Sequence, residues 1–207
     1  MNICIIGGGG YVGLITGVGF AHLGNRVVSV DVDEKRVAML QKGQCPIYEE
    51  GLEQAIKDNL EANRITFTTD ISTGVRDAEV IFVAVGSPSY EDGSANLSQV
   101  HQVIKELADN LNHYVVIVVK STVPIGAVDL MRKVLHDKGA SEETFDIVVN
   151  PEFLREGHGL QDFFCLDRIV IGTDSERARA VMRRLYAPFI RDNKGLGEET
   201  TNVPLIE

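Results

Sequence analysis

The chain has 207 residues, 44% hydrophobic and 24% charged, and a formal net charge of −10 from 20 Lys and Arg against 30 Asp and Glu. A globular chain of this size buries roughly 70% of its unfolded surface and needs no disulfides. The acidic balance argues against a nucleic-acid partner. No run of about 18 apolar residues is present, which argues against a membrane span.

Short β-branched runs alternate along the chain with longer segments of helical period. We predict strands at 2–7, 26–31, 65–68, 80–85, 114–120, 146–149 and 168–172, and helices at 12–23, 34–42, 52–61, 97–110, 127–137 and 175–186. This alternation is typical of βαβ units. The predicted fold class is therefore α/β, a doubly wound, mainly parallel sheet with helices on both faces.

The end of the chain differs in composition from the rest. The segment 191–202 is polar, and the short apolar run at 203–206 has the pattern of a strand that is only beginning. A compact domain rarely stops inside a new apolar segment. We therefore expect one domain over 1–190 and a tail over 191–207 that leads toward a further part of a longer protein.

Three cysteines, Cys4, Cys45 and Cys165, lie far apart and form no CxxC pair. With five scattered histidines they offer no metal-ligand spacing, so no metal site is predicted. Unpaired cysteines are typical of a reducing compartment. We expect a cytoplasmic protein.

A glycine-rich motif links the first predicted strand to the first predicted helix. It has the spacing G-x-G-x-x-G and consists of Gly8, Gly10 and Gly13, with Tyr11 and Val12 inside it. Such a motif needs a tight turn, a bare backbone for a pyrophosphate and a helix amino terminus that faces the anion. It predicts a dinucleotide site, with a glycine-rich turn of a methyltransferase or another α/β protein as the alternative.

An acidic residue at the end of the second predicted strand supports the dinucleotide interpretation. Asp31 follows Gly13 by 18 residues, where a carboxylate can accept hydrogen bonds from both ribose hydroxyls and repels a 2′-phosphate. We therefore predict a Rossmann-like domain that binds NAD rather than NADP. Arg36, on the next helix, can also touch the ribose and weakens that preference.

Three loops follow the carboxyl ends of later strands, where ligands of open α/β sheets lie. The first two contain Ser87, Ser121 and Thr122. Ser87 is interpreted equally well as a helix cap or a cofactor contact, and Thr122 can combine capping with holding a water or a substrate hydroxyl. The third loop, NPEFLREG, places Glu152 and Glu156 four residues apart, which predicts a shared helical face with one carboxylate as a general base. A solvated surface turn is the alternative.

Seven segments together resemble the UDP-glucose/GDP-mannose dehydrogenase family: GGGYVGL, VDVDEKRV, PIYEEGLEQ, VGSPSYEDGSANLSQV, KSTVPIG, NPEFLREG and DRIVIG. The resemblance implies an NAD-dependent nucleotide-sugar 6-dehydrogenase. Such an enzyme oxidises the C6 alcohol of UDP-glucose, or of a related nucleotide sugar, to a carboxylate in two steps, with two NAD molecules and a covalent thioester on a cysteine.

The resemblance also implies roles for individual residues. The implied cofactor contacts are Gly8, Gly10, Tyr11, Val12, Gly13, Asp31, Arg36, Ser87, Ser121, Thr122 and Glu156, and the implied wall of the sugar site is Glu152, Phe153, Leu154, Arg155 and Glu156. Glu152 matches the carboxylate that activates water in thioester hydrolysis. Thr122 matches a hydroxyl that positions this water. Ser87 stands where the family usually has threonine and keeps the hydroxyl.

Family members are about twice as long as this chain, and the half that is absent here supplies a dimer helix with catalytic lysine and asparagine, the nucleophilic cysteine and a second α/β domain. None of the three cysteines matches the nucleophile by motif. Cys165 lies in the apolar stretch 163–166, and we expect it to be buried. We therefore expect this chain to bind NAD but not to complete the oxidation, and to be monomeric or weakly associated, while the full-length protein is a homodimer.

Two other functions remain open. One is a stand-alone NAD-binding regulatory module with no chemistry of its own. The other is a different NAD-dependent hydroxyl dehydrogenase, of the 6-phosphogluconate or 3-hydroxyacyl type, which needs its own lysine or histidine base. We find no motif for such a base.

Overall fold

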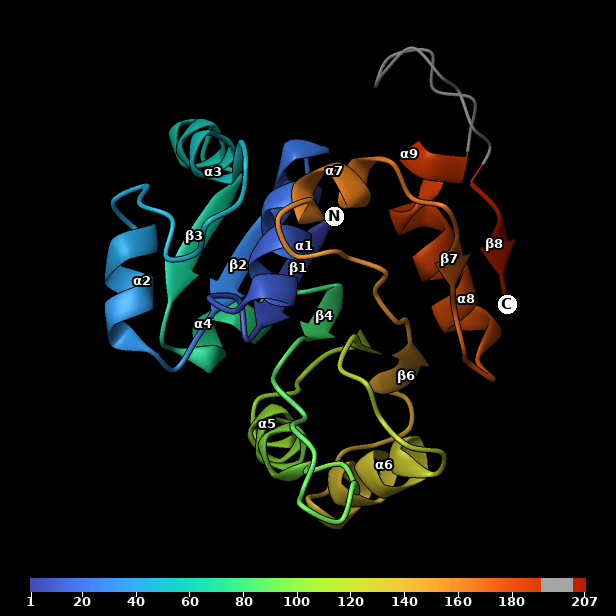
Figure 1. The fold of residues 1–207 in the computed structure, drawn as a ribbon. Helices are drawn as coiled ribbons and strands as arrows, with labels where there is room; N and C mark the ends of the chain where they lie inside the picture. The colour runs from blue at the N-terminus through green and yellow to red at the C-terminus, as the bar shows by residue number, and fades with distance from the viewer. Residues whose placement is uncertain (191–202) are drawn as a thin grey trace.

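The computed structural model describes residues 1–190 and 203–207, and its main feature is a six-stranded parallel sheet (Figure 1). The strand order is β3-β2-β1-β4-β5-β6, so the predicted doubly wound parallel sheet is confirmed. The strands are β1 Asn2–Ile6, β2 Arg26–Val30, β3 Ile65–Thr68, β4 Val80–Val83, β5 Val115–Val119 and β6 Phe145–Val149.

Helices cover both faces of this sheet (Figure 1). One face packs against α1 Tyr11–His22, α2 Glu34–Leu40, α3 Leu52–Glu61, α7 Gly159–Phe164, α8 Glu176–Leu185 and α9 Ala187–Ile190. The other packs against α4 Ile71–Val75, α5 Ser98–Ala108 and α6 Ala127–Asp137. The helices α4, α7 and α9 were not predicted, because four to six residues are too few for a helical period to show.

Alternation along the strands separates the two cores. In β1, Ile3 and Ile5 belong to the cluster around α1, whereas Cys4 and Ile6 face the cluster around α5. Because both faces are covered, the strands are apolar throughout rather than alternating with polar residues. This explains why the sequence shows them as continuous β-branched runs.

The last predicted strand, 168–172, is not part of the parallel sheet, which corrects that prediction. Its central part forms β7 Ile169–Val170, which pairs in parallel with β8 Leu205–Ile206 in a separate two-stranded sheet. The segment after β7 is joined to the edge strand β6 by an antiparallel bridge between Val149 and Gly172. The apolar run at 203–206 thus finds its partner within this chain, while 191–202 of the predicted tail lies outside the described residues.

Candidate functional site

A groove crosses the carboxyl edge of the sheet where the strand order reverses between β1 and β4, which is the usual ligand position of such sheets. Two cavities of about 370 and 310 Å³ form it. They share Gly10 and the segment 84–86, so they are two ends of one groove. Asp31 lies at one end, and Thr122 and Glu152 lie at the other.

Asp31 is buried at the end of β2 and holds the glycine-rich loop in place. Its Oδ2 accepts a hydrogen bond from the Gly9 amide at 2.7 Å, and its Oδ1 accepts one from the Asp33 amide at 3.0 Å. Arg36 lines the same cavity, and its Nε lies 3.4 Å from Asp33 Oδ2. The carboxylate is therefore oriented before any ligand binds and retains acceptor capacity toward the groove.

The glycine-rich loop leaves no room for a side chain at the first and last glycines of its motif. A Cβ on Gly13 would lie 2.2 Å from the Gly7 carbonyl oxygen, and one on Gly8 would lie 1.9 Å from Ser29 Oγ. Gly10 is different, because its nearest neighbour would be 3.4 Å away. Gly10 is also the N-cap of α1 and gives no side-chain cap, so the first amides of the helix are available to an anion at the groove.

The other end of the groove is built by the loops after β4 and β5, which bind each other. Ser87 Oγ donates to the Thr122 carbonyl at 2.9 Å, and Ser121 Oγ donates to the Val85 carbonyl at 2.5 Å. Neither Ser87 nor Thr122 is a helix cap, since α5 begins at Ser98 and α6 has Gly126 as its N-cap. The capping alternative is thus wrong, and the exposed Thr122 side chain lines the groove.

The NPEFLREG loop is irregular from 151 to 155, so the predicted shared helical face of Glu152 and Glu156 is wrong. A helix does not form there because the loop's hydrogen bonds go to partners outside it. Glu152 is half-buried and lines the groove, whereas Glu156 is exposed in the following turn and is not among the lining residues of either cavity. The two carboxylates therefore occupy different environments.

The three residues between these carboxylates also have different surroundings. Arg155 turns to Asp162 of α7, with Nη2 2.6 Å from Oδ1, and holds the pKa of that carboxyl below its usual range. Phe153 is 47% exposed beneath the Arg168 guanidinium, whose Cζ lies 5.2 Å from the ring centroid. Leu154 is half-buried and packs against the core. Of the predicted sugar-site wall, Glu152 alone lines the groove itself.

Glu49 anchors this loop and was missed by the sequence analysis. Its buried carboxylate accepts from the amides of Gly157 at 3.0 Å and Leu160 at 3.4 Å. Tyr11 adds a bond from its hydroxyl to the Arg155 carbonyl at 2.5 Å, and burial, followed by the charge of Glu49, raises the pKa of Tyr11 to about 12. The PIYEEG segment contained Glu49, but nothing in its spacing indicates a contact over 108 residues.

Lys120 is the second residue that the sequence analysis missed. It follows β5 and is only 8% exposed, although it lines the groove together with Thr122 and Glu152. Burial lowers the pKa of its ammonium to about 8, and the charge of Glu152 opposes that fall. A lysine that directly follows a five-residue apolar strand was the available signal.

The cysteines lie away from the groove. Cys4 is buried in β1, and burial raises its pKa to about 12, while Cys45 is half-buried between α2 and α3. Cys165 is exposed, which corrects the expectation that it is buried. The reason is that α7 ends at Phe164, so that Phe163 takes the inward position and Cys165 leaves the helix as its C-cap.

The fold and the groove define a dinucleotide-binding dehydrogenase domain: a parallel sheet with a reversal point, a crowded glycine turn at a helix amino terminus, and an oriented acid after the second strand. The comparison with protein families agrees. Residues 1–190 match the model of the UDP-glucose/GDP-mannose dehydrogenase family, NAD binding domain. The chain belongs to this family, and its cofactor is NAD.

Individual relatives place the chain within the family. It is 44% identical over 197 residues to UDP-glucose 6-dehydrogenase of Pseudomonas aeruginosa (94% of this chain, 43% of the relative) and 46% identical over 192 residues to that of Rhizobium meliloti (91% and 44%). The solved UDP-glucose dehydrogenase of Pyrobaculum islandicum superposes with a TM-score of 0.86 at 36% identity, over 99% of this chain and 45% of that one. The chain thus spans less than half of the length of these relatives.

In the described ranges, 1–190 and 203–207, no helix has the length and apolar character needed to cross a membrane. Within the same ranges, no group of three or more His, Cys, Asp and Glu side chains has the arrangement of a metal site.

Proposed function

We propose that this chain is the cofactor-binding part of an NAD-dependent UDP-glucose 6-dehydrogenase, which converts UDP-glucose to UDP-glucuronate. The observation that carries the proposal is the continuous groove from Asp31 to Glu152 across the reversal point of the sheet. The relatives named UDP-glucose 6-dehydrogenase, at 44% and 46% identity, support the choice of sugar.

The groove suggests how its residues divide the cofactor. The adenosine ribose would lie against Asp31 and Arg36, which line the 370 Å³ cavity. The pyrophosphate would lie at Gly10, Tyr11 and Val12, on the first amides of α1. Gly8 and Gly13 would act by letting the backbone of the turn pack closely against Ser29 and Gly7.

The nicotinamide end would be lined by the hydroxyl loops and the NPEFLREG loop. When bound, NAD supplies the acceptor for a hydride from the sugar C6. Ser87 and Ser121 lock the two hydroxyl loops together, so that the side chain of Thr122 is presented at the groove. Glu152 faces the same space and can orient or deprotonate a water molecule there. The hydroxyl of Thr122 would hydrogen-bond to the same water molecule. Glu156 and segment 153–155 would contribute to the outer wall of the sugar site.

The proposed chemistry exceeds what this chain alone supplies. Cys4, Cys45 and Cys165 are absent from the lining of the groove in the described structure. A thioester mechanism needs a reachable thiolate. We therefore infer that this chain binds NAD without completing the oxidation, and that the rest of a full-length enzyme supplies the nucleophile and most of the sugar contacts.

The partners and the location follow from the same proposal. The substrate partner would be UDP-glucose or a related nucleotide sugar. We infer that the full-length protein is a homodimer and that this chain alone is monomeric or weakly associated. Light scattering on the purified chain measures the association state of the chain alone. The three free thiols support a cytoplasmic location.

Calorimetric titration of the purified chain with NAD, NADP and UDP-glucose tests the proposal. NAD binding that exceeds NADP binding, with weak or absent UDP-glucose binding, supports it. Tight NADP binding would contradict the role of Asp31. Tight UDP-glucose binding would contradict the assignment of the sugar contacts to the rest of the enzyme.

A further inference from the structure

A small cavity lies beside the groove, beneath the NPEFLREG loop. Its volume is about 20 Å³, which is room for one water molecule and too little for a larger ligand. Polar side chains from five segments line it: Thr16 of α1, Lys120 after β5, Asn150 and Glu152 after β6, Arg168 before β7, and Tyr186 after α8. Lys120 and Glu152 line both this cavity and the groove, so they form the partition between the two.

One polar atom of the cavity is buried without a hydrogen-bond partner, and a largely buried ammonium lies beside it. Thr16 is 1% exposed, and its Oγ1 has no hydrogen-bond partner among the described residues. Lys120 is 8% exposed and lines both the cavity and the groove, so most of its side chain is removed from solvent. Buried polar groups are normally satisfied by protein or by ordered water.

Two further polar side chains of the cavity, Asn150 and Tyr186, already have hydrogen-bond partners. Asn150 Oδ1 accepts from the Tyr186 hydroxyl at 2.6 Å, and Asn150 Nδ2 donates to the Val170 carbonyl at 2.7 Å. The Arg168 guanidinium, which also lines the cavity, lies over the Phe153 ring. The buried atom of the cavity that lacks a partner is therefore Thr16 Oγ1, and the Lys120 ammonium and the Glu152 carboxylate line the same space.

We propose that Lys120 is a positioning residue for Glu152, and that one water molecule, anchored on the hydroxyl of Thr16, joins the ammonium to the carboxylate. The water accepts from Lys120 Nζ and donates to Glu152, while Thr16 Oγ1 fixes its place. Lys120 does not touch the substrate in this arrangement. The functional role of Lys120 rests on the proposed role of Glu152 at the groove. The charge coupling between Lys120 and Glu152 does not depend on that role.

The coupling is tested on the purified chain without NAD or nucleotide sugar. The protein is labelled with ¹³C at the lysine ε carbons and titrated by NMR, and the Lys120 resonance is the one that Lys120→Met removes. We expect a midpoint near 8. Glu152→Gln should lower this midpoint by about one pH unit, because the ammonium loses its anion. Thr16→Val, which has the same shape, should also lower it, because the water loses its anchor.

Glu156→Gln is the matched control, since that carboxylate is exposed and four residues away. It should leave the Lys120 midpoint unchanged. A midpoint that Glu152→Gln does not move would overturn the coupling, and one that Thr16→Val does not move would overturn the water's place. Because no ligand is used, a negative titration leaves the proposed dehydrogenase function standing, and absent NAD binding leaves this result standing.

Crystal structures of the wild type and of Lys120→Met at one pH test the positioning itself. The wild type should show one water within hydrogen-bond distance of Thr16 Oγ1 and Lys120 Nζ. In the variant we expect the Glu152 carboxylate to turn away from the partition. An unchanged Glu152 side chain in the variant would overturn the positioning role, and a direct bond from Nζ to the carboxylate in the wild type would overturn the bridging water.

Discussion

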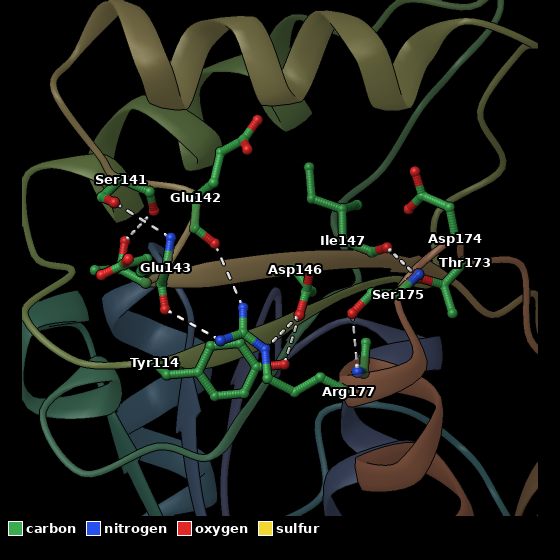
Figure 2. Close-up of polar contacts among 12 residues, drawn as sticks. Tyr114, Ser141, Glu142, Glu143, Asp146, Ile147, Thr173, Asp174, Ser175 and Arg177 are labelled. Atoms are coloured by element: carbon green, nitrogen blue, oxygen red, sulfur yellow. Dashed lines mark hydrogen bonds and ion pairs between the residues drawn. The ribbon is translucent and has the colours of Figure 1, made fainter.

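The guanidinium of Arg177 lies over the ring of Tyr114, with its Cζ 3.7 Å from the ring centroid. Asp146 completes the contact, because its Oδ2 accepts both the Tyr114 hydroxyl at 2.7 Å and Arg177 Nε at 3.0 Å (Figure 2). Tyr114 directly precedes β5 and Asp146 is near the start of β6, so this cluster pins α8 to the amino edge of the sheet, opposite the groove.

This cluster should contribute to stability and not to ligand binding. We expect Tyr114→Leu to lower the free energy of unfolding by about 1–2 kcal/mol, through loss of the cation–π contact and the buried hydrogen bond. Arg177→Lys should also destabilise, because lysine cannot stack and donate in the same fixed geometry. Urea denaturation of the two single variants and the double variant measures their coupling.

Arg184→Ala is the control, since Arg184 lies on the same helix in an exposed ion pair with Glu79 and such pairs contribute little. If the effects of the Tyr114 and Arg177 changes on the free energy of unfolding are additive, the stacking contributes nothing to stability. A change in NAD affinity would contradict the placement of the cluster away from the groove.

Asp31→Asn should weaken NAD binding about 10–100-fold, because the charged acceptor of the ribose hydroxyls is lost. The amide retains one oxygen for the Gly9 N–H, so the loop should keep its fold. Asp70→Asn is the matched control, since Asp70 is the exposed N-cap of α4 and lines neither cavity of the groove. Calorimetry decides, and equal NAD affinities for wild type and Asp31→Asn would refute the assignment.

Two alanine substitutions in the glycine-rich loop should have opposite effects. Gly13→Ala places a methyl group 2.2 Å from the Gly7 carbonyl oxygen, so the turn must open, at a cost of about 1–3 kcal/mol. Gly10→Ala meets nothing closer than 3.4 Å and should unfold like the wild type, yet obstruct the pyrophosphate. Thermal unfolding and NAD titration of both variants test this, and a Gly10→Ala protein with undiminished affinity would move the pyrophosphate elsewhere.

Glu49→Ala should release the NPEFLREG loop. The variant leaves the amides of Gly157 and Leu160 without their acceptor, which costs about 2 kcal/mol. Hydrogen exchange should then rise over 153–160 and stay unchanged in β5. Glu50→Ala, at the exposed neighbour, should leave exchange as it is. Equal protection of the loop in both variants would show that Tyr11 and Asp162 hold it without Glu49.

Lys120 should make stability depend on pH in a definite direction. Its folded pKa, about 8, is below its ordinary 10.5, so between these values the unfolded chain binds more protons and stability rises with pH. Relative to Lys120→Met, the wild type should therefore gain about 3 kcal/mol as the pH rises across this window. Urea denaturation of both proteins over the window measures it, and a constant difference would mean that the ammonium is not desolvated.

The sequence was sufficient for the features that local periodicity and spacing encode. Apolar β-branched runs identify strands buried on both faces, and helical periods identify the longer helices other than α1, because each pattern records the surroundings of its own segment. The helix α1 is buried along Gly13 to Ala21 and is apolar all round, so the glycine motif before it was its signal. The glycine motif and Asp31 were recognisable for a similar reason, since the turn and the strand end that they require are local. The sequence could also predict that the strand-end loops meet at one groove, because parallel strands share one carboxyl edge.

The tertiary structure decided everything that depends on contacts between distant segments. The pairing of β7 with β8, the anchoring of the NPEFLREG loop by Glu49 and the stacking of Arg177 on Tyr114 each join residues whose separation carries no pattern. The sequence of the NPEFLREG loop does not predict its irregular backbone, since its hydrogen-bond partners lie elsewhere in the chain. Lys120 became notable only once packing buried it beside Glu152, because the cost of desolvating a charge depends on the surrounding atoms and not on the neighbouring sequence.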